Sequence, residues 1–298
     1  MRLGYDKVVD EEPAAKEKGA NMGIYVCSDI HGMYDLYCRM LETVQFSDGD
    51  HLYILGDMID RGPDGIKILQ DVIDRENVTC LIGNHEHMMW YYLNQADDPI
   101  GDAWMLPGNG GRKTLTPYTM LPDEDRRKIR CFLDDLYLQV ELTVGGKTFL
   151  LSHSSFLRDS GTVRWKDPGV TEEEVLEVVW CSPWRTGEYI DPADYKEDGR
   201  YHIIGHVPVL LIEDWEWPSG ERPDMPRYYE DEENHIVNID LGCAFIPTVR
   251  DGLYDADRRA DGASLCVFDL ERFSAGDQDA ALSEKLNSTC KVKFHTED

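Results

Sequence analysis

Six short apolar segments of this chain each end abruptly in an aspartate, an asparagine or a histidine. They are IYVCSDIHG (24–32), HLYILGDMIDRG (51–62), TCLIGNHE (79–86), TFLLSHSS (148–155), YHIIGHVP (201–208) and HIVNIDLG (235–242). Continuous apolar runs of this length indicate strands that are buried on both faces. The chain is therefore expected to fold around a sheet core with polar groups at the strand ends.

Two helical patterns separate the first three segments. Leu36, Met40 and Val44 are spaced four residues apart, and residues 66–73 carry a comparable apolar stripe. The order strand, helix, strand, helix, strand predicts parallel βαβ units. In sheets of that kind ligands collect at the carboxyl ends of the strands. We therefore expect the polar strand ends to lie together.

The rest of the chain divides less regularly. Residues 87–140 are expected to be mainly helical, interrupted by the glycine-rich loop PGNGGRKT (107–114), with a further helix over 170–180 and an edge strand over 264–270. No Ser/Gly-rich or Pro-rich linker divides the chain, which favours one domain.

We expect a single catalytic domain over residues 22–273, preceded by a flexible N-terminal arm (1–21) and followed by a C-terminal tail (274–298). Residues 213–234 contain three prolines and no sustained period, so they are expected to form a surface insertion between two strands. Two interpretations stay open for it, a substrate-recognition flap and a packed surface loop.

The charge of the chain excludes some partners. Among 298 residues, 58 are Asp or Glu and 30 are Lys or Arg, which gives a net charge of −28. A surface this negative repels phosphate backbones and anionic lipid, so neither nucleic acid nor a membrane is expected as a partner. The N-terminus lacks the apolar stretch of a signal peptide, and eight cysteines are scattered without a CxxC pair, so we expect a cytoplasmic protein.

The polar strand ends form a donor set for metal ions. Its members are Asp29, His31, Asp57, Asp60, Asn84, His85, His153 and His206. Carboxylate, imidazole and amide donors together suit Mn, Fe or Zn better than Ca or Mg. The set is too large for one ion, so it predicts two divalent ions about 3.5–4 Å apart that share a carboxylate, an arrangement suited to displacement at phosphorus.

The motifs DIHG, GDMIDRG and GNHE, followed by single histidines in SHSS and GHVP, closely resemble those of the phosphoprotein phosphatase family of calcineurin-like metallophosphoesterases. The resemblance runs from about Ile24 to Phe245, and GNHEHMM, WMLPGNGG and IDLG are most similar to the bacterial and lambda-phosphatase branch. It implies an α/β calcineurin-like metallophosphoesterase fold, in which two packed mixed β-sheets are flanked by helices as an αββα sandwich.

The resemblance implies a role for each motif residue. The metal ligands that it implies are Asp29 and His31 for the first ion, Asp57 as the bridge, and Asn84, His153 and His206 for the second. Manganese is the expected metal, with iron or zinc as alternatives. A hydroxide between the two ions would attack phosphorus directly, so no phosphoenzyme is required.

The same resemblance implies the remaining catalytic groups. His85 would protonate the leaving group, and Asp60 would orient the imidazole of His85. Arg61 and Asn84 would bind phosphate oxygens. A second phosphate-binding arginine is expected after the helix that ends near residue 180. Arg185 is the choice for that role and Arg112 in the glycine loop is the alternative.

Three neighbouring features have competing interpretations. Glu86 is expected to fix its loop through backbone hydrogen bonds rather than to bind metal, and His87 is expected to be a helix side chain rather than a ligand. The glycine loop 107–114 is expected to be a turn, with a phosphate cradle as the alternative.

The expected function is that of a dimetal phosphomonoesterase, a protein phosphatase of serine/threonine or dual specificity that acts on phosphorylated proteins, peptides or small phosphoesters. The alternative is a symmetrical dinucleoside polyphosphate hydrolase of the diadenosine tetraphosphate type. The spellings GNHE and DRGP favour the first, because the specialised dinucleotide group more often carries GNHD and lacks DRG. A non-catalytic scaffold would have lost a ligand or the acid, and the chain retains both. No particular oligomeric state is predicted.

Overall fold

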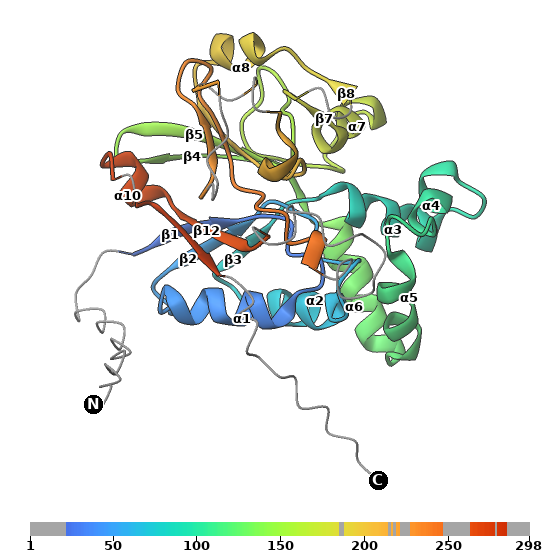
Figure 1. The fold of residues 1–298 in the computed structure, drawn as a ribbon. Coiled ribbons are helices and arrows are strands. Elements are labelled where there is room, and N and C mark those ends of the chain that lie inside the picture. The colour runs from blue at the N-terminus through green and yellow to red at the C-terminus, as the bar shows by residue number, and fades with distance from the viewer. Residues whose placement is uncertain are drawn as a thin grey trace, which may run out of the picture.

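Two β-sheets lie face to face in the computed structural model of the protein, and helices cover their outer faces (Figure 1). The structure describes residues 22–184, 188–213, 216, 219–220, 227–246, 263–277 and 279–284. This arrangement confirms the expected αββα sandwich with two mixed sheets.

The first sheet contains the three N-terminal strands. Its order is β13 (Ala281–Glu284), β12 (Leu265–Asp269), β1 (Ile24–Cys27), β2 (His51–Ile54) and β3 (Val78–Cys80). Strands β1, β2 and β3 are parallel, and β12 runs antiparallel to β1. The crossovers α1 (Tyr34–Thr43) and α2 (Gly65–Ile73) lie on the outer face of this sheet, as the βαβ pattern predicts (Figure 1).

The second sheet contains the later strands. Its order is β10 (Tyr229–Asp231), β11 (Ile236–Asn238), β9 (Tyr201–Ile204), β5 (Lys147–Ser152), β4 (Tyr137–Val144) and β6 (Val163–Arg164). Strands β5, β9 and β11 are parallel to one another. All six apolar segments of the sequence therefore form strands, three in each sheet.

Burial on both faces explains why these segments are apolar throughout. In β1, Tyr25 and Cys27 belong to the core beneath the first sheet, whereas Val26 belongs to the core between the sheets. Phe149 and Ile203 of the second sheet belong to the same intersheet core. An uninterrupted apolar run is what a strand packed on both faces requires.

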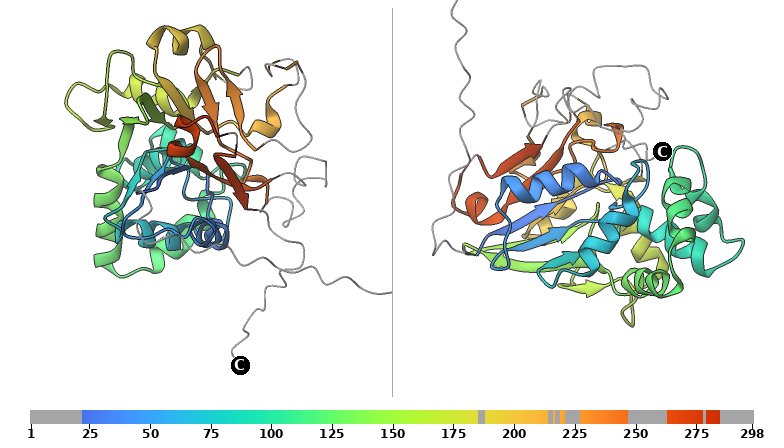
Figure 2. Two further views of the ribbon diagram at one scale, coloured as in Figure 1. Left: turned by 90° about the vertical axis from the view of Figure 1, so that its left-hand side faces the viewer. Right: turned by 90° about the horizontal axis from the view of Figure 1, so that it is seen from below.

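The helices fall mainly where the sequence predicts them. Four of them occupy the region after β3: α3 (Asn84–Asn94), α4 (Pro99–Trp104), α5 (Gly111–Met120) and α6 (Asp123–Asp134). In Figure 1 and Figure 2, α3, α4 and α5 lie beyond the carboxyl ends of β1, β2 and β3, whereas α6 lies beside α2. The predicted helix over 170–180 is α7 (Glu172–Trp180), and a capping box between Thr171 and Glu174 starts it.

Several smaller elements complete the description. They are the pair β7 (Cys181–Ser182) and β8 (Glu188–Tyr189), helix α8 (Pro192–Asp198), the 3₁₀ turn η1 (Val209–Leu211) and α10 (Leu270–Ser274). No helix among the described residues is both long enough and apolar enough to cross a membrane.

Two expectations about the C-terminal half need correction. The segment 264–270 is not an edge strand, because β13 pairs with β12 through Val267 and Leu282 and covers that edge. The expected domain boundary at 273 therefore falls before the last strand of the sheet. The insertion 213–234 also contributes a strand, because β10 pairs antiparallel with β11 and forms one edge of the second sheet. The predicted arm over 1–21 lies outside the described residues.

Candidate metal centre

The loops that follow β1 and β2 are joined by backbone hydrogen bonds at the carboxyl end of the first sheet. The amide of Asp29 donates to the carbonyl of Gly56 (3.2 Å), and the amide of His31 donates to the carbonyl of Asp57 (2.9 Å). A glycine allows the second sheet to approach, since a Cβ on Gly205 would lie 2.3 Å from Oδ2 of Asp29. The loops that follow strands of both sheets thus come together at this end of the sandwich.

The backbone at this point is unusual. Ten described residues other than glycine have positive φ, and six of them are predicted site residues: Asp29, His31, Asp57, Asp60, Arg61 and His206, with φ between 47° and 69°. Residues other than glycine adopt this region uncommonly, and strained backbone of this kind concentrates at functional sites. The structure therefore marks the same residues that the motifs mark.

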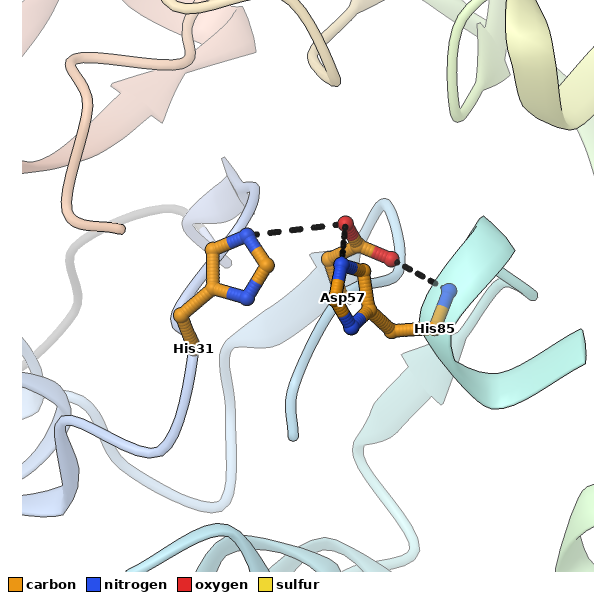
Figure 3. A group of neighbouring side chains, drawn as sticks. All are labelled: His31, Asp57 and His85. Carbon is orange, nitrogen blue, oxygen red and sulfur yellow. Dashed lines mark hydrogen bonds and ion pairs between the residues drawn. The ribbon is translucent and has the colours of Figure 1, made fainter. Parts of the chain in front are cut away.

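Asp57 lies at the centre of two groups of potential metal donors. Its Oδ2 is 3.5 Å from Nε2 of His31 and 3.9 Å from Nε2 of His85 (Figure 3). Its Oδ1 is 3.7 Å from Nε2 of His153. One group joins Asp57 with His31 and His85, and the other joins it with His153 and His206. A carboxylate shared by two donor groups is what a bridged pair of cations requires.

The imidazoles are oriented for coordination. Nδ1 of His31 lies 3.1 Å from the carbonyl of Ile59, and Nδ1 of His153 lies 2.8 Å from the carbonyl of Leu55. A carbonyl can only accept, so each Nδ1 carries the proton and each Nε2 presents a lone pair toward Asp57. Burial, and then the charge of Arg61, hold the pKa of His31 well below its usual value. The imidazole is therefore neutral, as a metal ligand must be.

Asp29 and Asn84 complete the donor set. Oδ2 of Asp29 accepts hydrogen bonds from the hydroxyl of Ser28 and from the amide of His206 (3.0 Å). Its Oδ1 is buried and has no hydrogen-bond partner among the described residues, and it lies 3.9 Å from Nε2 of His31. Oδ1 of Asn84 lies 3.1 Å from Nε2 of His153. A buried carboxylate oxygen without a donor beside neutral imidazoles fits a bound cation.

Glu86 fixes the loops, as the sequence predicts. Its carboxylate accepts from the backbone amides of Asp57 (2.7 Å), Met58 (2.9 Å) and Gly83 (3.1 Å). Burial, and then the charge of Asp57, raise the pKa of Glu86 to about 8. His87 is also no ligand in this arrangement, because its ring lies 3.0 Å from Glu172 and packs edge-on against Trp165.

His85 and Asp60 form a buried pair beside the donor set. Nδ1 of His85 lies 2.6 Å from Oδ2 of Asp60, and both side chains are fully buried. Burial raises the pKa of Asp60 to about 7, and burial holds the pKa of His85 well below its usual value. Nε2 of His85 has no hydrogen-bond partner among the described residues and faces Asp57. This nitrogen therefore lies beside the donor group of Asp57 and His31.

The arginines separate into three cases. Nη1 of Arg61 donates to Nε2 of His31 at 3.0 Å, so its guanidinium reaches the donor set. Arg112 is exposed at the start of α5, and no contact between its side chain and the centre is present in the described region. Arg185 lies outside the described residues, so its predicted role stays a prediction.

The structure adds one residue that the motif analysis did not single out. Asp240, after β11, is 2% exposed, and its Oδ1 accepts from the amide of Gly242 (2.8 Å). Burial, and then the charge of Asp29, hold the pKa of Asp240 well above its usual value. The signal was available in the sequence, because Asp240 ends the sixth apolar segment just as the predicted ligands end the others.

Comparison with known proteins decides the family. A family model described as calcineurin-like phosphoesterase matches residues 22–210. The chain belongs to this family. The matched range contains every predicted metal ligand together with His85, Asp60 and Arg61.

The proteins similar to this chain include both dinucleoside tetraphosphatases and a protein phosphatase. The symmetrical bis(5'-nucleosyl)-tetraphosphatase of Acidovorax sp. (strain JS42) is 42% identical over 138 residues, which are 46% of this chain and 45% of that protein. The chain thus matches less than half the length of this relative. Two solved structures share the fold, each at 13% sequence identity and over 90% of this chain. One is a candidate diadenosine tetraphosphatase, of which 96% is covered (TM-score 0.50). The other is a protein serine/threonine phosphatase from Saccharomyces cerevisiae with similarity to human phosphatase PP5, of which 80% is covered (TM-score 0.52).

Proposed function

We propose that the protein is a metal-dependent phosphomonoesterase that removes phosphate from phosphorylated protein side chains, phosphoserine and phosphothreonine first. The buried pair of His85 and Asp60 carries this proposal. Asp29, His31, Asp57, Asn84, His153 and His206 would hold two divalent ions, most favourably manganese. When bound, such ions lower the pKa of a coordinated water and neutralise charge that develops on phosphate oxygens.

The leaving group explains why the pair matters. Hydrolysis of phosphoserine expels an alkoxide, which is strongly basic and needs a proton as the bond breaks. His85 can deliver that proton from Nε2 while Asp60 holds Nδ1, at 2.6 Å, and favours the charged imidazolium. Arg61 supplies a forked donor for the phosphate oxygens. A hydrolase of phosphoanhydrides expels a weakly basic phosphate and depends far less on such an acid.

A second function is favoured by the Acidovorax relative, whose name describes a symmetrical bis(5'-nucleosyl)-tetraphosphatase. The present chain could therefore hydrolyse diadenosine tetraphosphate at the same centre. Two observations weigh against it as the main activity. Asp60 completes an acid pair on which a poor leaving group depends far more than a phosphate leaving group does, and a net charge of −28 disfavours a polyanionic substrate.

Turnover measurements separate the two functions. The purified protein, loaded with Mn²⁺, is assayed on a phosphoserine peptide, a phosphotyrosine peptide, p-nitrophenyl phosphate and diadenosine tetraphosphate, with metal content determined in parallel. We expect the highest kcat/KM on the phosphoserine peptide and metal bound at two ions per chain. Activity on diadenosine tetraphosphate alone would overturn the proposed function.

The substitution Asp60→Asn tests the role of the acid pair. Because general acid catalysis contributes about 10²–10⁴-fold, we expect a loss of that order on the phosphoserine peptide and a much smaller loss on p-nitrophenyl phosphate, whose leaving group is weakly basic. Asp102→Asn is the matched control, since Asp102 is exposed on α4. An equal loss on both substrates would contradict the assignment.

A further inference from the structure

The segment from Trp104 to Thr114 packs onto the two site residues Asp60 and Arg61. Trp104 ends α4, Thr114 lies in the first turns of α5, and the glycine loop connects them. The amide of Asn109 donates through Nδ2 to the carbonyl of Ala103 (2.8 Å), which closes the loop on itself. Neither helix contributes a predicted metal ligand, so the contacts call for a separate explanation.

Three hydrogen bonds join this segment to Asp60. Nε1 of Trp104 donates to Oδ2 of Asp60 at 2.6 Å, and the hydroxyl of Thr114 donates to Oδ1 at 2.5 Å. The backbone amide of Asp60 in turn donates to the same hydroxyl oxygen at 3.0 Å. All three side chains are at most 1% exposed. Water therefore cannot replace any of these donors without opening the core.

The glycine loop presses against Arg61. A Cβ on Gly110, where φ is +78°, would lie 2.6 Å from the backbone nitrogen of Arg61. Nζ of Lys113 donates to the carbonyl of Arg61 at 2.9 Å. Gly111 is equally confined, because a Cβ there would lie 2.5 Å from the carbonyl oxygen of Trp104. Gly110 and Gly111 thus permit close backbone packing, as the expected turn requires.

We propose that Trp104 and Thr114 are positioning residues which hold the Asp60 carboxylate in one orientation, and through it aim His85 at the leaving group. This inference rests on the proposed phosphomonoesterase function. The segment 104–114 is a clamp on the turn that carries both Asp60 and Arg61.

Geometry explains why two donors are needed. Oδ2 of Asp60 accepts from both His85 and Trp104, and Oδ1 accepts from Thr114. If the carboxylate rotated about its Cβ–Cγ bond, the bonds to Trp104 and Thr114 would break together. Trp104 and Thr114 therefore hold the Asp60 side chain in one rotamer. The remaining lone pair on Oδ2 then fixes the plane of the His85 imidazole. The hydrogen bonds from Thr114 and Trp104 also lower the pKa of Asp60 against the effect of burial, which favours the charged acceptor.

The test uses the variants Trp104→Phe and Thr114→Val, which delete one donor each at nearly constant shape. We expect kcat on the phosphoserine peptide to fall about 10-fold or more in each, with a smaller change on p-nitrophenyl phosphate and little change in KM. Thr114→Ser, which keeps the hydroxyl, should restore most of the rate. Matched controls are Trp90→Phe, because Nε1 of Trp90 donates to the remote Asp134 (2.7 Å), and the exposed Thr116→Val.

A second measurement does not depend on turnover. In the zinc-loaded protein, the proton on Nδ1 of His85 should give a low-field NMR signal, which His85→Asn removes and so assigns. We expect this signal to be shifted or lost in Trp104→Phe and Thr114→Val and unchanged in both controls. An unchanged signal in the two variants, or equal rate losses on both substrates, would overturn the clamp. A wild-type protein inactive on all phosphomonoesters would overturn the proposed function instead. The NMR result would still show whether Trp104 and Thr114 hold Asp60 and His85 in place.

Discussion

At the scale of single residues, the centre combines strained backbone with side chains that tolerate it. The six site residues with φ between 47° and 69° each carry a cost of about 1–3 kcal/mol. Five of the six are Asp or His, which are enriched in this region. The hydrogen bonds that join the loops after β1 and β2 offset this cost. Each loop therefore turns sharply at the end of its strand, and the side chains of successive loop residues lie together at the centre.

The bridging role of Asp57 gives the first residue-scale prediction. Asp57→Asn replaces one carboxylate oxygen by an NH₂ group and removes the negative charge that the two donor groups share. We expect metal content to fall from two ions per chain and hydrolysis of p-nitrophenyl phosphate to drop by more than the 10–100-fold typical of losing an outer partner of a metal ligand. Elemental analysis and the rate, measured beside an exposed Asp102→Asn control, check this. A variant that kept both metals and the full rate would show that Asp57 is not the bridge.

At the scale of elements, the strand-end pattern predicts most of the fold and most of the centre. An apolar run buried on both faces is recognisable in sequence because nothing polar interrupts it, and the residue that ends it is local to it. That is why β1, β2 and β3 could be predicted together with the candidate ligands that follow them. The same reasoning fails for β13, since a short strand after an expected boundary carries no such pattern.

Contacts between distant elements could not be predicted in this way. Trp104 and Thr114 lie 44 and 54 residues from Asp60 in sequence, and only the packing of α4 and α5 onto the loop after β2 brings them together. Trp104 begins the segment WMLPGNGG, but nothing in that segment or in the residues around Thr114 indicates a contact with Asp60. Asp240 is a different case, because its place at the end of a strand and within the segment IDLG was visible in the sequence, although no role was assigned to it.

Glu86 joins elements and gives an element-scale prediction. Its pKa is raised from 4.5 to about 8, so between these pH values the folded protein binds more protons than the unfolded chain. The free energy of unfolding of the protein stripped of metal by EDTA should therefore fall as the pH rises from 5 to 8, and Glu86→Gln should lessen that fall. Urea unfolding at both pH values measures it, with the exposed Glu173→Gln as control. The same slope in wild type and Glu86→Gln would contradict the prediction.

At the scale of the whole molecule, the metal centre depends on how the two sheets face each other. Asp29, His31, Asp57 and Asn84 follow strands of the first sheet, whereas His153 and His206 follow β5 and β9 of the second. The apolar core between the sheets therefore sets the distance between the two donor groups. Repacking that core should disturb metal binding even where no ligand is touched.

The net charge of −28 gives the last prediction. A surface this negative repels anionic substrates over about a Debye length, roughly 8 Å at physiological ionic strength, while the donor set and Arg61 attract a phosphoryl group only locally. Raising the salt concentration should therefore increase kcat/KM by a few-fold for an acidic phosphopeptide and decrease it for a lysine-rich phosphopeptide of the same length, because screening removes repulsion in the first case and attraction in the second. Steady-state rates at about 0.02 and 0.3 M salt measure both. p-Nitrophenyl phosphate, which is small, serves as the control with the least dependence on salt. If both peptides changed in the same direction, the surface charge would play no part in selecting substrates.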